Sequence, residues 1–238
     1  MQRSQGDLES ALGYHQQHFQ IALAVNDQDG QANALENLGV THYYLGAYKM
    51  ALDLCQSSLR VSAEIGDRKS IAVTLGSLGN ISIALGNLQE ALQYYKQQLE
   101  IAGEINYLEG QEKAVGNMGI VYKELGDYAA SLECLHHKLS LAYQLQSRES
   151  EAHALSNMGN TYTCLKDYGE AIRCQEGSIE LFRAIGDRWG CAAAMCNLGD
   201  AYRLSEDFDQ AVLWLLNSLI IFDSLQAAQI ETVMLLAA

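Results

Sequence analysis

Six cysteines and six histidines are the residues best suited to hold a metal ion or to do covalent chemistry. Cys191 and Cys196 lie five residues apart, and no C-x-x-C pair is present, whereas zinc ligands cluster at such short spacings. His15 and His18 lie one helical turn apart without a third ligand in register. The sequence also lacks a G-x-S-x-G elbow, a phosphate-binding glycine loop and a Ser/His/Asp arrangement. We therefore predict a non-enzymatic chain without a metal or cofactor.

The composition restricts the class of protein further. The 238 residues carry a formal charge of −14, which argues against a nucleic-acid partner because that affinity depends on clustered Lys and Arg. No apolar run approaches the roughly 20 residues of a membrane helix and no secretory leader is evident, so we expect no membrane insertion. Cysteines without a disulfide pattern favour a cytoplasmic location. With no proline and 20 glycines, the chain is predicted to be all-α.

The elements that position these residues recur every 40 residues. An Asn/Ser-Leu/Met-Gly triplet begins at positions 37, 77, 117, 157 and 197. Further columns keep the same register: a small residue at 51, 91, 131, 171 and 211, and an aliphatic residue at 59, 99, 139, 179 and 219. Such self-similarity is typical of a repeat architecture, in which each unit is one supersecondary element.

Each repeat is predicted to form two antiparallel helices. In the third repeat, helix A covers about 111–125 and helix B about 128–145, with Gly126-Asp127 as the break, because Gly suits a C-cap and Asp an N-cap. Gly119 and its equivalents lack a Cβ, so helix B can approach helix A closely. One pair cannot cover its own apolar faces, so neighbouring pairs must stack. The predicted fold is a right-handed α-α superhelix of antiparallel helix pairs.

The predicted division treats residues 1–238 as one array. It has five full repeats at 28–67, 68–107, 108–147, 148–187 and 188–225. Residues 1–27 are interpreted as a half repeat with helix B only, and 226–238 as a partial helix A that caps the end, with Gln229, Ile230, Val233 and Leu236 at amphipathic spacing. We interpret the chain as a segment of a longer array, with a short protein with unusual caps as the alternative.

This pattern resembles the tetratricopeptide repeat. The best copies are NMGIVYKELGDYAASLECL at 117–135 and NMGNTYTCLKDYGEAIRC at 157–174. The common form has 34 residues and a closing Pro. The 40-residue form without Pro is similar to LGN/Pins-type polarity adaptors, rapsyn, kinesin light chains and bacterial regulatory proteins. The resemblance implies a protein-interaction scaffold whose helices A line a concave face.

Helical spacing then identifies the residues on that concave face. Its 30 positions carry three basic and three acidic residues, so the net charge of −14 lies elsewhere. Asn amides form a ladder along it and match the main chain of an extended peptide. The related arrays imply such a grip, whereas bonding between helices is the open alternative. The candidate peptide-binding residues are Asn37, Tyr43, Tyr44, Asn80, Lys113, Asn117, Lys123, His153, Asn157, Asn160, Asn197 and Arg203.

The clamp that chaperone-binding relatives use for a terminal carboxylate is absent. Its lysine position holds Glu36, Gly76, Gly116, Ser156 and Cys196. Lys113, Lys123 and Arg203 suit acidic side chains of a linear motif, or are simply solvated, and the two tyrosines offer an apolar anchor.

We expect a scaffold that binds a linear or helical segment of another protein. Two alternatives stay open. In the first, the chain is a peptide-sensing regulatory domain of a larger signalling protein. In the second, it is a module that associates end to end through its terminal half repeats, as apolar Leu8, Leu12, Val233 and Leu236 suggest.

Overall fold

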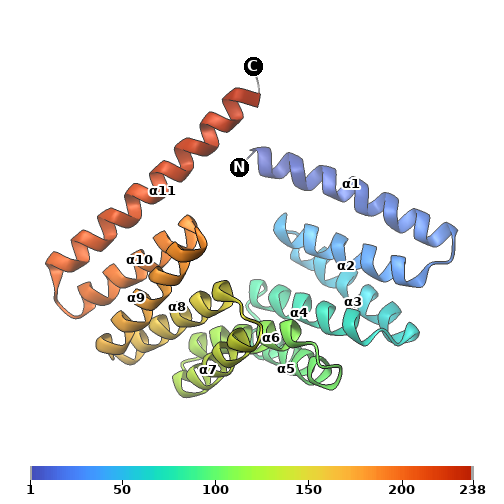
Figure 1. Cartoon of the computed structure of the whole chain (residues 1–238). Helices are drawn as coiled ribbons and strands as arrows, with labels where there is room; N and C mark the ends of the chain where they lie inside the picture. Colours follow the sequence, from blue (N-terminus) through green and yellow to red (C-terminus); the bar gives the residue numbers. More distant parts are fainter. Residues whose placement is uncertain (1, 237–238) are drawn as a thin grey trace. The chain divides into compact units, whose positions relative to one another are not determined.

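The computed structural model describes the backbone of residues 2–236 and the side chains of residues 7–225. Within residues 2–236 the chain forms eleven α-helices and no strand, which confirms the all-α prediction (Figure 1). Their bounds are α1 Gln2–Ala24, α2 Gln28–Tyr44, α3 Tyr48–Ile65, α4 Arg68–Ala84, α5 Leu88–Glu104, α6 Leu108–Glu124, α7 Tyr128–Gln144, α8 Arg148–Leu165, α9 Tyr168–Ile185, α10 Arg188–Leu204 and α11 Phe208–Leu236.

The chain divides into two compact units, Met1–Val121 and Tyr122–Ala238, which are described separately below as unit 1 and unit 2. In unit 1, α2 packs on α3 and α4 on α5; in unit 2, α8 packs on α9 and α10 on α11. The even-numbered helices from α2 to α10 are the helices A of the repeats, and the odd-numbered helices are the helices B. Helix A of the third repeat begins at Leu108, three residues before the start expected from its pattern.

Each turn between the described helices uses a left-handed residue, and in most of them the next residue caps the following helix with its side chain. Gly66 has φ +75° and the Asp67 carboxylate accepts hydrogen bonds from the backbone N–H groups of Lys69 and Ser70. A side-chain hydrogen bond with Ser70 chiefly, together with these backbone bonds, lowers the pKa of Asp67. Lys166 adopts φ +63° without being a glycine, so the backbone geometry is kept where the residue type departs from the pattern.

Glycine at the middle of helix A permits a close crossing with helix B. A Cβ on Gly39 would lie 2.4 Å from the Cys55 Sγ and 3.2 Å from the backbone oxygen of Ala51. A Cβ on Gly79 would meet the Tyr95 ring at 2.4 Å. The expected role of this column is therefore confirmed in the first two repeats, and Gly199 repeats it against Leu215.

A column of buried serines ties helix B to helix A. The Ser58 hydroxyl donates to the backbone oxygen of Ala32 at 2.8 Å, and Ser178 and Ser218 make the equivalent bonds at 2.9 and 2.7 Å. In all three the acceptor lies 26 residues before the serine. Each bond pairs a buried hydroxyl, which would otherwise cost free energy, and fixes the relative height of the two helices.

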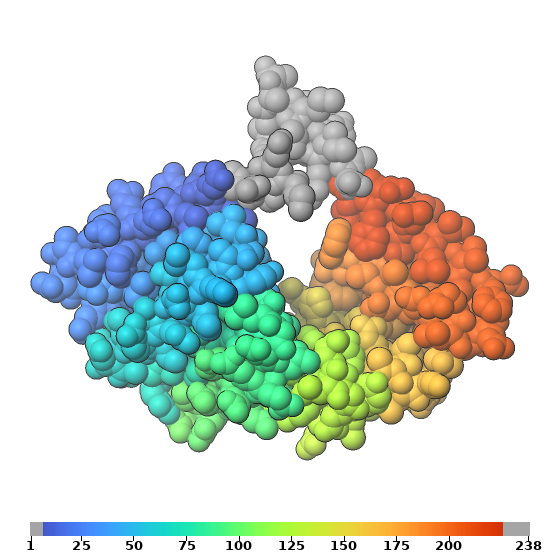
Figure 2. All heavy atoms as spheres, turned by 180° about the vertical axis from the view of Figure 1, so that it is seen from behind, coloured from blue at the N-terminus to red at the C-terminus, as the bar shows by residue number. Residues whose placement is uncertain are grey.

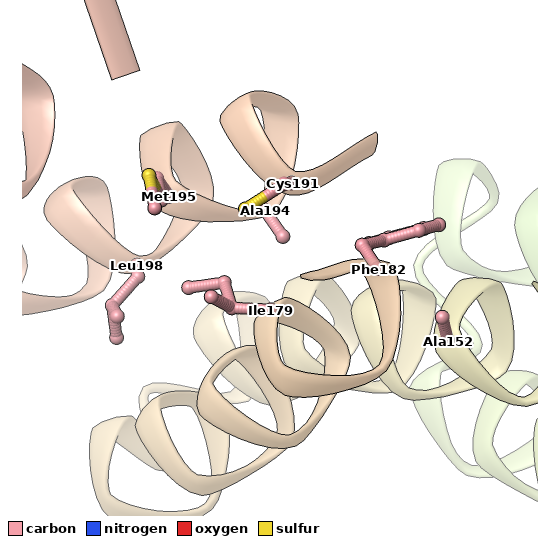
Figure 3. Close-up of a cluster of buried hydrophobic side chains, with 7 residues drawn as sticks. All are labelled: Ala152, Ile179, Phe182, Cys191, Ala194, Met195 and Leu198. Carbon is pink, nitrogen blue, oxygen red and sulfur yellow. The ribbon is translucent and has the colours of Figure 1, made fainter. Parts of the chain in front are cut away.

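The core of unit 2 lies between α8, α9 and α10. Figure 3 shows Ile179 and Phe182 of α9 beside Cys191, Met195 and Leu198 of α10. Ile179 is only 2% exposed. Helix A thus covers the apolar stripe of the preceding helix B here, and α2, α4 and α8 likewise pack on α1, α3 and α7. Stacked pairs bury a continuous core in this way.

The two ends differ from the expected division. No turn separates 226–236 from the last helix B, because α11 runs unbroken from Phe208 to Leu236. The separate helix A predicted there is wrong: the other repeats have Gly-Asp, Asn-Tyr or Gln-Ser at this junction, whereas Gln226-Ala227 has neither a Gly or Asn nor a capping Asp or Ser, which favours helix continuation. The side chains of Gln229, Ile230, Val233 and Leu236 lie outside the described residues. Leu8 and Leu12 of α1 are half-buried rather than exposed.

One helical stretch of the described residues, Phe208–Leu225, is long and apolar enough to cross a membrane by length and composition. Its mean hydropathy is 1.3 and it spans 18 residues, so the expectation that no segment approaches a membrane span needs this correction. Two aspartates, Asp209 and Asp223, lie inside it.

Substituting Gly39 by Ala is expected to destabilise the protein by about 1 to 3 kcal/mol, because the new Cβ overlaps Cys55 and the α3 backbone. The matched control is Gly13→Ala in α1, where no atom lies within 4 Å of the added Cβ. There the better helix propensity of Ala should leave stability unchanged or raise it by up to about 1 kcal/mol. Urea unfolding followed by circular dichroism measures both, and equal effects would contradict the close-crossing argument.

Candidate functional site

The predicted peptide-binding residues all lie on helices A and are at least partly exposed. Buried residues on either side of them, such as Leu38 and Ala34 of α2, hold each helix against its neighbours. In unit 1 the residues are Asn37, Tyr43, Tyr44, Asn80, Lys113 and Asn117. In unit 2 they are Lys123, His153, Asn157, Asn160, Asn197 and Arg203. We name these two sets the helix A surfaces of units 1 and 2.

In unit 1 the amide of Asn80 links three helices. Its Oδ1 accepts a hydrogen bond of 2.7 Å from the Tyr95 hydroxyl of α5. The same oxygen accepts a longer bond of 3.4 Å from Asn117 Nδ2 of α6. Tyr95 is fully buried, which raises the pKa of its hydroxyl well above the usual range and leaves that group dependent on Asn80. Asn80 therefore has a structural role.

Asn160 has the same role in unit 2. Its Oδ1 accepts a bond of 3.0 Å from Nε2 of Gln175, which is buried on α9. The amide of Asn197 donates to Ser156 Oγ at 3.4 Å, across to the preceding helix A. The spacing of 41 residues recurs in unit 1, where Ser77 donates to Glu36 at 2.9 Å. These bonds hold successive helices A together.

Two amides of the ladder remain available. Among the described residues, the side chains of Asn37 and Asn157 have no hydrogen-bond partner, and both are half-exposed. Each can offer two donors and one acceptor oxygen to a ligand. The structure thus divides the predicted ladder into members that tie helices together and members whose amides face no protein group.

The three basic residues also differ. Lys123 Nζ lies 3.1 Å from a carboxylate oxygen of Glu124, and Arg203 Nε lies 3.1 Å from that of Asp200. Lys113 is exposed and has no ion-pair partner among the described residues. Exposed ion pairs contribute little to stability, so Lys123 and Arg203 can exchange their present partners for a carboxylate of a ligand.

Aromatic rings lie at one end of the unit 1 surface. The Tyr43 and Tyr44 rings meet edge to face with centroids 5.4 Å apart, and Tyr48 lies 5.7 Å from Tyr43. Burial chiefly, with smaller contributions from Tyr48 and Tyr44, raises the pKa of Tyr43. Tyr44 is 68% exposed, so its ring can contact a partner. In unit 2, His153 meets the Phe182 ring edge to face at 5.0 Å, so packing positions its imidazole.

The cysteines do not form a reactive centre in the described part of the chain. All six are free thiols, and burial raises the pKa of Cys55 to about 12 and that of Cys174 to about 11. Cys164 is exposed. No group of three or more His, Cys, Asp or Glu side chains is placed to hold a metal ion within residues 7–225. These thiols are unreactive where they are buried, because the thiolate is the nucleophile.

The pattern did not reveal the partners of the ladder. Tyr95 and Gln175 occupy the same helix B column as Cys55, opposite the glycine of the repeated triplet in helix A. A polar residue in a column that should be apolar is a signal that a hydrogen-bond partner lies across the crossing, and it was available in the sequence.

Asn80→Ala is expected to lower the free energy of unfolding by about 1 to 3 kcal/mol, because the buried Tyr95 hydroxyl loses its acceptor. Asn37→Ala is the matched control and should leave stability within about 0.5 kcal/mol of the parent. Urea unfolding distinguishes them. If both variants unfold at the same urea concentration, the division of the ladder is wrong.

Comparison with solved structures places this geometry among helical-repeat proteins. BtubC (BKLC) from P. vanneervenii superposes with a TM-score of 0.80 at 18% identity, covering 92% of both chains. A putative kinesin light chain of Podosopora anserina gives 0.68 at 16% identity, with 82% of this chain and 96% of that chain covered. A Rap protein complexed with Competence and Sporulation Factor gives 0.72 at 16% identity over 82% of this chain and 56% of that chain. At such identities the likeness concerns the fold. No curated protein sequence matches.

The sequence profile of the tetratricopeptide repeat matches four overlapping stretches, residues 1–64, 31–104, 70–142 and 150–221. Together they cover most of the chain, in agreement with the 40-residue register and the stacked helix pairs. The chain therefore belongs to the tetratricopeptide repeat family.

Proposed function

We propose that the chain is a non-enzymatic scaffold whose helix A surfaces bind an extended or helical segment of a partner protein. The observation that carries this proposal is the pair of half-exposed amides, Asn37 and Asn157, which occupy the same repeat position and face no protein group. An amide so placed can pair with both the N–H and the C=O of a peptide main chain. Proteins of this repeat family typically mediate protein–protein interaction.

The neighbouring side chains would give the partner its sequence preference. Exposed Lys113 in unit 1 suits an acidic side chain, and exposed Tyr44 suits an apolar one. The Rap relative, seen with Competence and Sporulation Factor, provides a precedent for a bound factor on this fold. The six free thiols fit a reducing compartment such as the cytoplasm.

A pull-down from cell extract tests the proposal with the parent chain and the double variant Asn37→Ala/Asn157→Ala. We expect a partner that binds the parent and binds the variant about ten-fold more weakly, as the loss of two hydrogen bonds would give. The binding constants are then measured with the purified partner by calorimetry.

The matched control is Gln93→Ala/Gln97→Ala, which removes two exposed amides from the outer side of α5. It should bind the partner like the parent, at an unchanged urea midpoint. A partner lost equally from both double variants, or retained by both, would refute the role of the helix A surfaces.

A further inference from the structure

Helix α11 exposes several large apolar side chains, and the proposed binding at the helix A surfaces does not explain them. Figure 2 shows the described part of α11, in red, at the edge of unit 2. Side chains of six apolar residues on this helix are at least half exposed. They are Phe208, Val212, Leu213, Leu216, Leu219 and Ile220.

Two of the six occupy columns that a following helix A normally covers. Leu219 is 54% exposed, whereas its equivalent Ile179 in α9 is 2% exposed beneath α10 (Figure 3). Val212 is the equivalent of Ile172, which packs against the same cluster. The exposure of these two residues follows from the lack of a following helix A packed on α11 among the described residues, and it indicates no additional partner.

Of the remaining four, Phe208 continues the mostly aromatic column that begins each helix B. The other three, which we name the outer triad, cannot be explained in either way. Leu213, Leu216 and Ile220 fall in columns that are polar and exposed in every earlier helix B of a full repeat. The columns are Asp53, Gln93, Glu133, Arg173 and Leu213; Gln56, Lys96, His136, Glu176 and Leu216; Arg60, Glu100, Ser140, Glu180 and Ile220. Twelve polar residues precede three apolar ones.

The outer triad has the geometry of a helix-binding seam. In α9 the equivalent residues stay exposed although α10 packs on that helix, so continuing the array would leave the outer triad uncovered. Its i, i+3, i+7 spacing forms one stripe on the helix surface, of the kind that accepts the apolar face of a second helix. A contiguous exposed apolar stripe of this kind marks an interaction site.

The charged residues beside the outer triad indicate which kind of partner can bind there. The sequence from 208 to 236 contains no Lys or Arg, whereas Asp209 lies one turn before the outer triad and Asp223 one turn after it. Neither aspartate has an ion-pair partner among the described residues, and both are exposed. Interfacial membrane helices carry basic residues beside their apolar face, so an anionic membrane is disfavoured. A second copy of the chain is also disfavoured as the occupant, because two chains that each carry a net charge of −14 repel each other.

We propose that the outer triad is a docking site for an amphipathic helix of a partner protein whose apolar stripe is flanked at both ends by basic residues. The apolar stripe covers Leu213, Leu216 and Ile220, and the flanking Lys or Arg side chains pair with Asp209 and Asp223. These two aspartates are about 21 Å apart along the helix axis, at 1.5 Å per residue over fourteen residues. This surface is separate from the helix A surfaces.

The probe is a labelled synthetic peptide with three leucines at i, i+3 and i+7 and one Lys at each end, fourteen residues apart. Its twin has Glu in place of both Lys. Binding to the full chain is measured by fluorescence anisotropy. We expect the Lys peptide to bind up to about ten-fold more tightly than the Glu twin, and this preference to shrink as NaCl rises from about 50 to about 300 mM.

Two variants localise the binding. Leu213→Gln/Leu216→Gln/Ile220→Gln places a polar residue at each position of the outer triad, as every earlier helix B of a full repeat does, so folding is preserved, and it should weaken the Lys peptide more than about ten-fold. Asp209→Asn/Asp223→Asn should retain binding but lose the preference for Lys. Asn37→Ala/Asn157→Ala, the helix A surface variant, should bind the probe like the parent, so the two proposals fail independently.

Other outcomes overturn the proposal. Equal binding of both peptides would show that the aspartates do not select a basic partner, and binding of neither would show that the outer triad is not a docking site for such a helix. A dimer in sedimentation velocity that the triple Gln variant abolishes would assign the surface to a second copy. Binding to vesicles of phosphatidylcholine and phosphatidylglycerol in equal parts, lost in the triple Gln variant, would assign it to a membrane.

Discussion

The close approach of two helices at a residue without a Cβ is the constraint on which the rest of the structure depends. At Gly39 the backbone of α3 comes so near α2 that one additional carbon would overlap a sulfur and nearly touch a carbonyl oxygen. That contact sets the distance between the helices of a pair, and the buried serine bond to the helix A backbone sets their relative height. With both fixed, each pair presents the same apolar stripe to the next pair, and stacking becomes repetitive.

The fold could be predicted from the sequence because its signals are local and repeated. The triplet at 37, 77, 117, 157 and 197 set the register, and a glycine or an aspartate marked most helix boundaries. The prediction was wrong at the C-terminus, where the same logic was extended past the last repeat without its break. Gln226-Ala227 contains neither a left-handed residue nor a cap, and α11 continues through it.

The candidate site could be predicted only in outline. Spacing placed the Asn residues on helices A, and all of them are at least partly exposed there. Spacing cannot state what each amide bonds, because that depends on the helix B residue across the crossing. Tyr95 and Gln175 engage Asn80 and Asn160, whereas the equivalent position of the first repeat holds Cys55. Departures from a column therefore carry information that the column itself does not.

The serine bonds have a further consequence for how such a chain can change. The acceptor in each is a main-chain oxygen, at Ala32, Ala152 and Ala192, rather than a side chain. Helix A is therefore held by an atom that every residue type possesses. Substitutions along its exposed stripe leave that bond intact, so the residues that contact a ligand can diversify while the pair keeps its geometry. The residues that determine ligand specificity can therefore change without a change in the geometry of the helix pair.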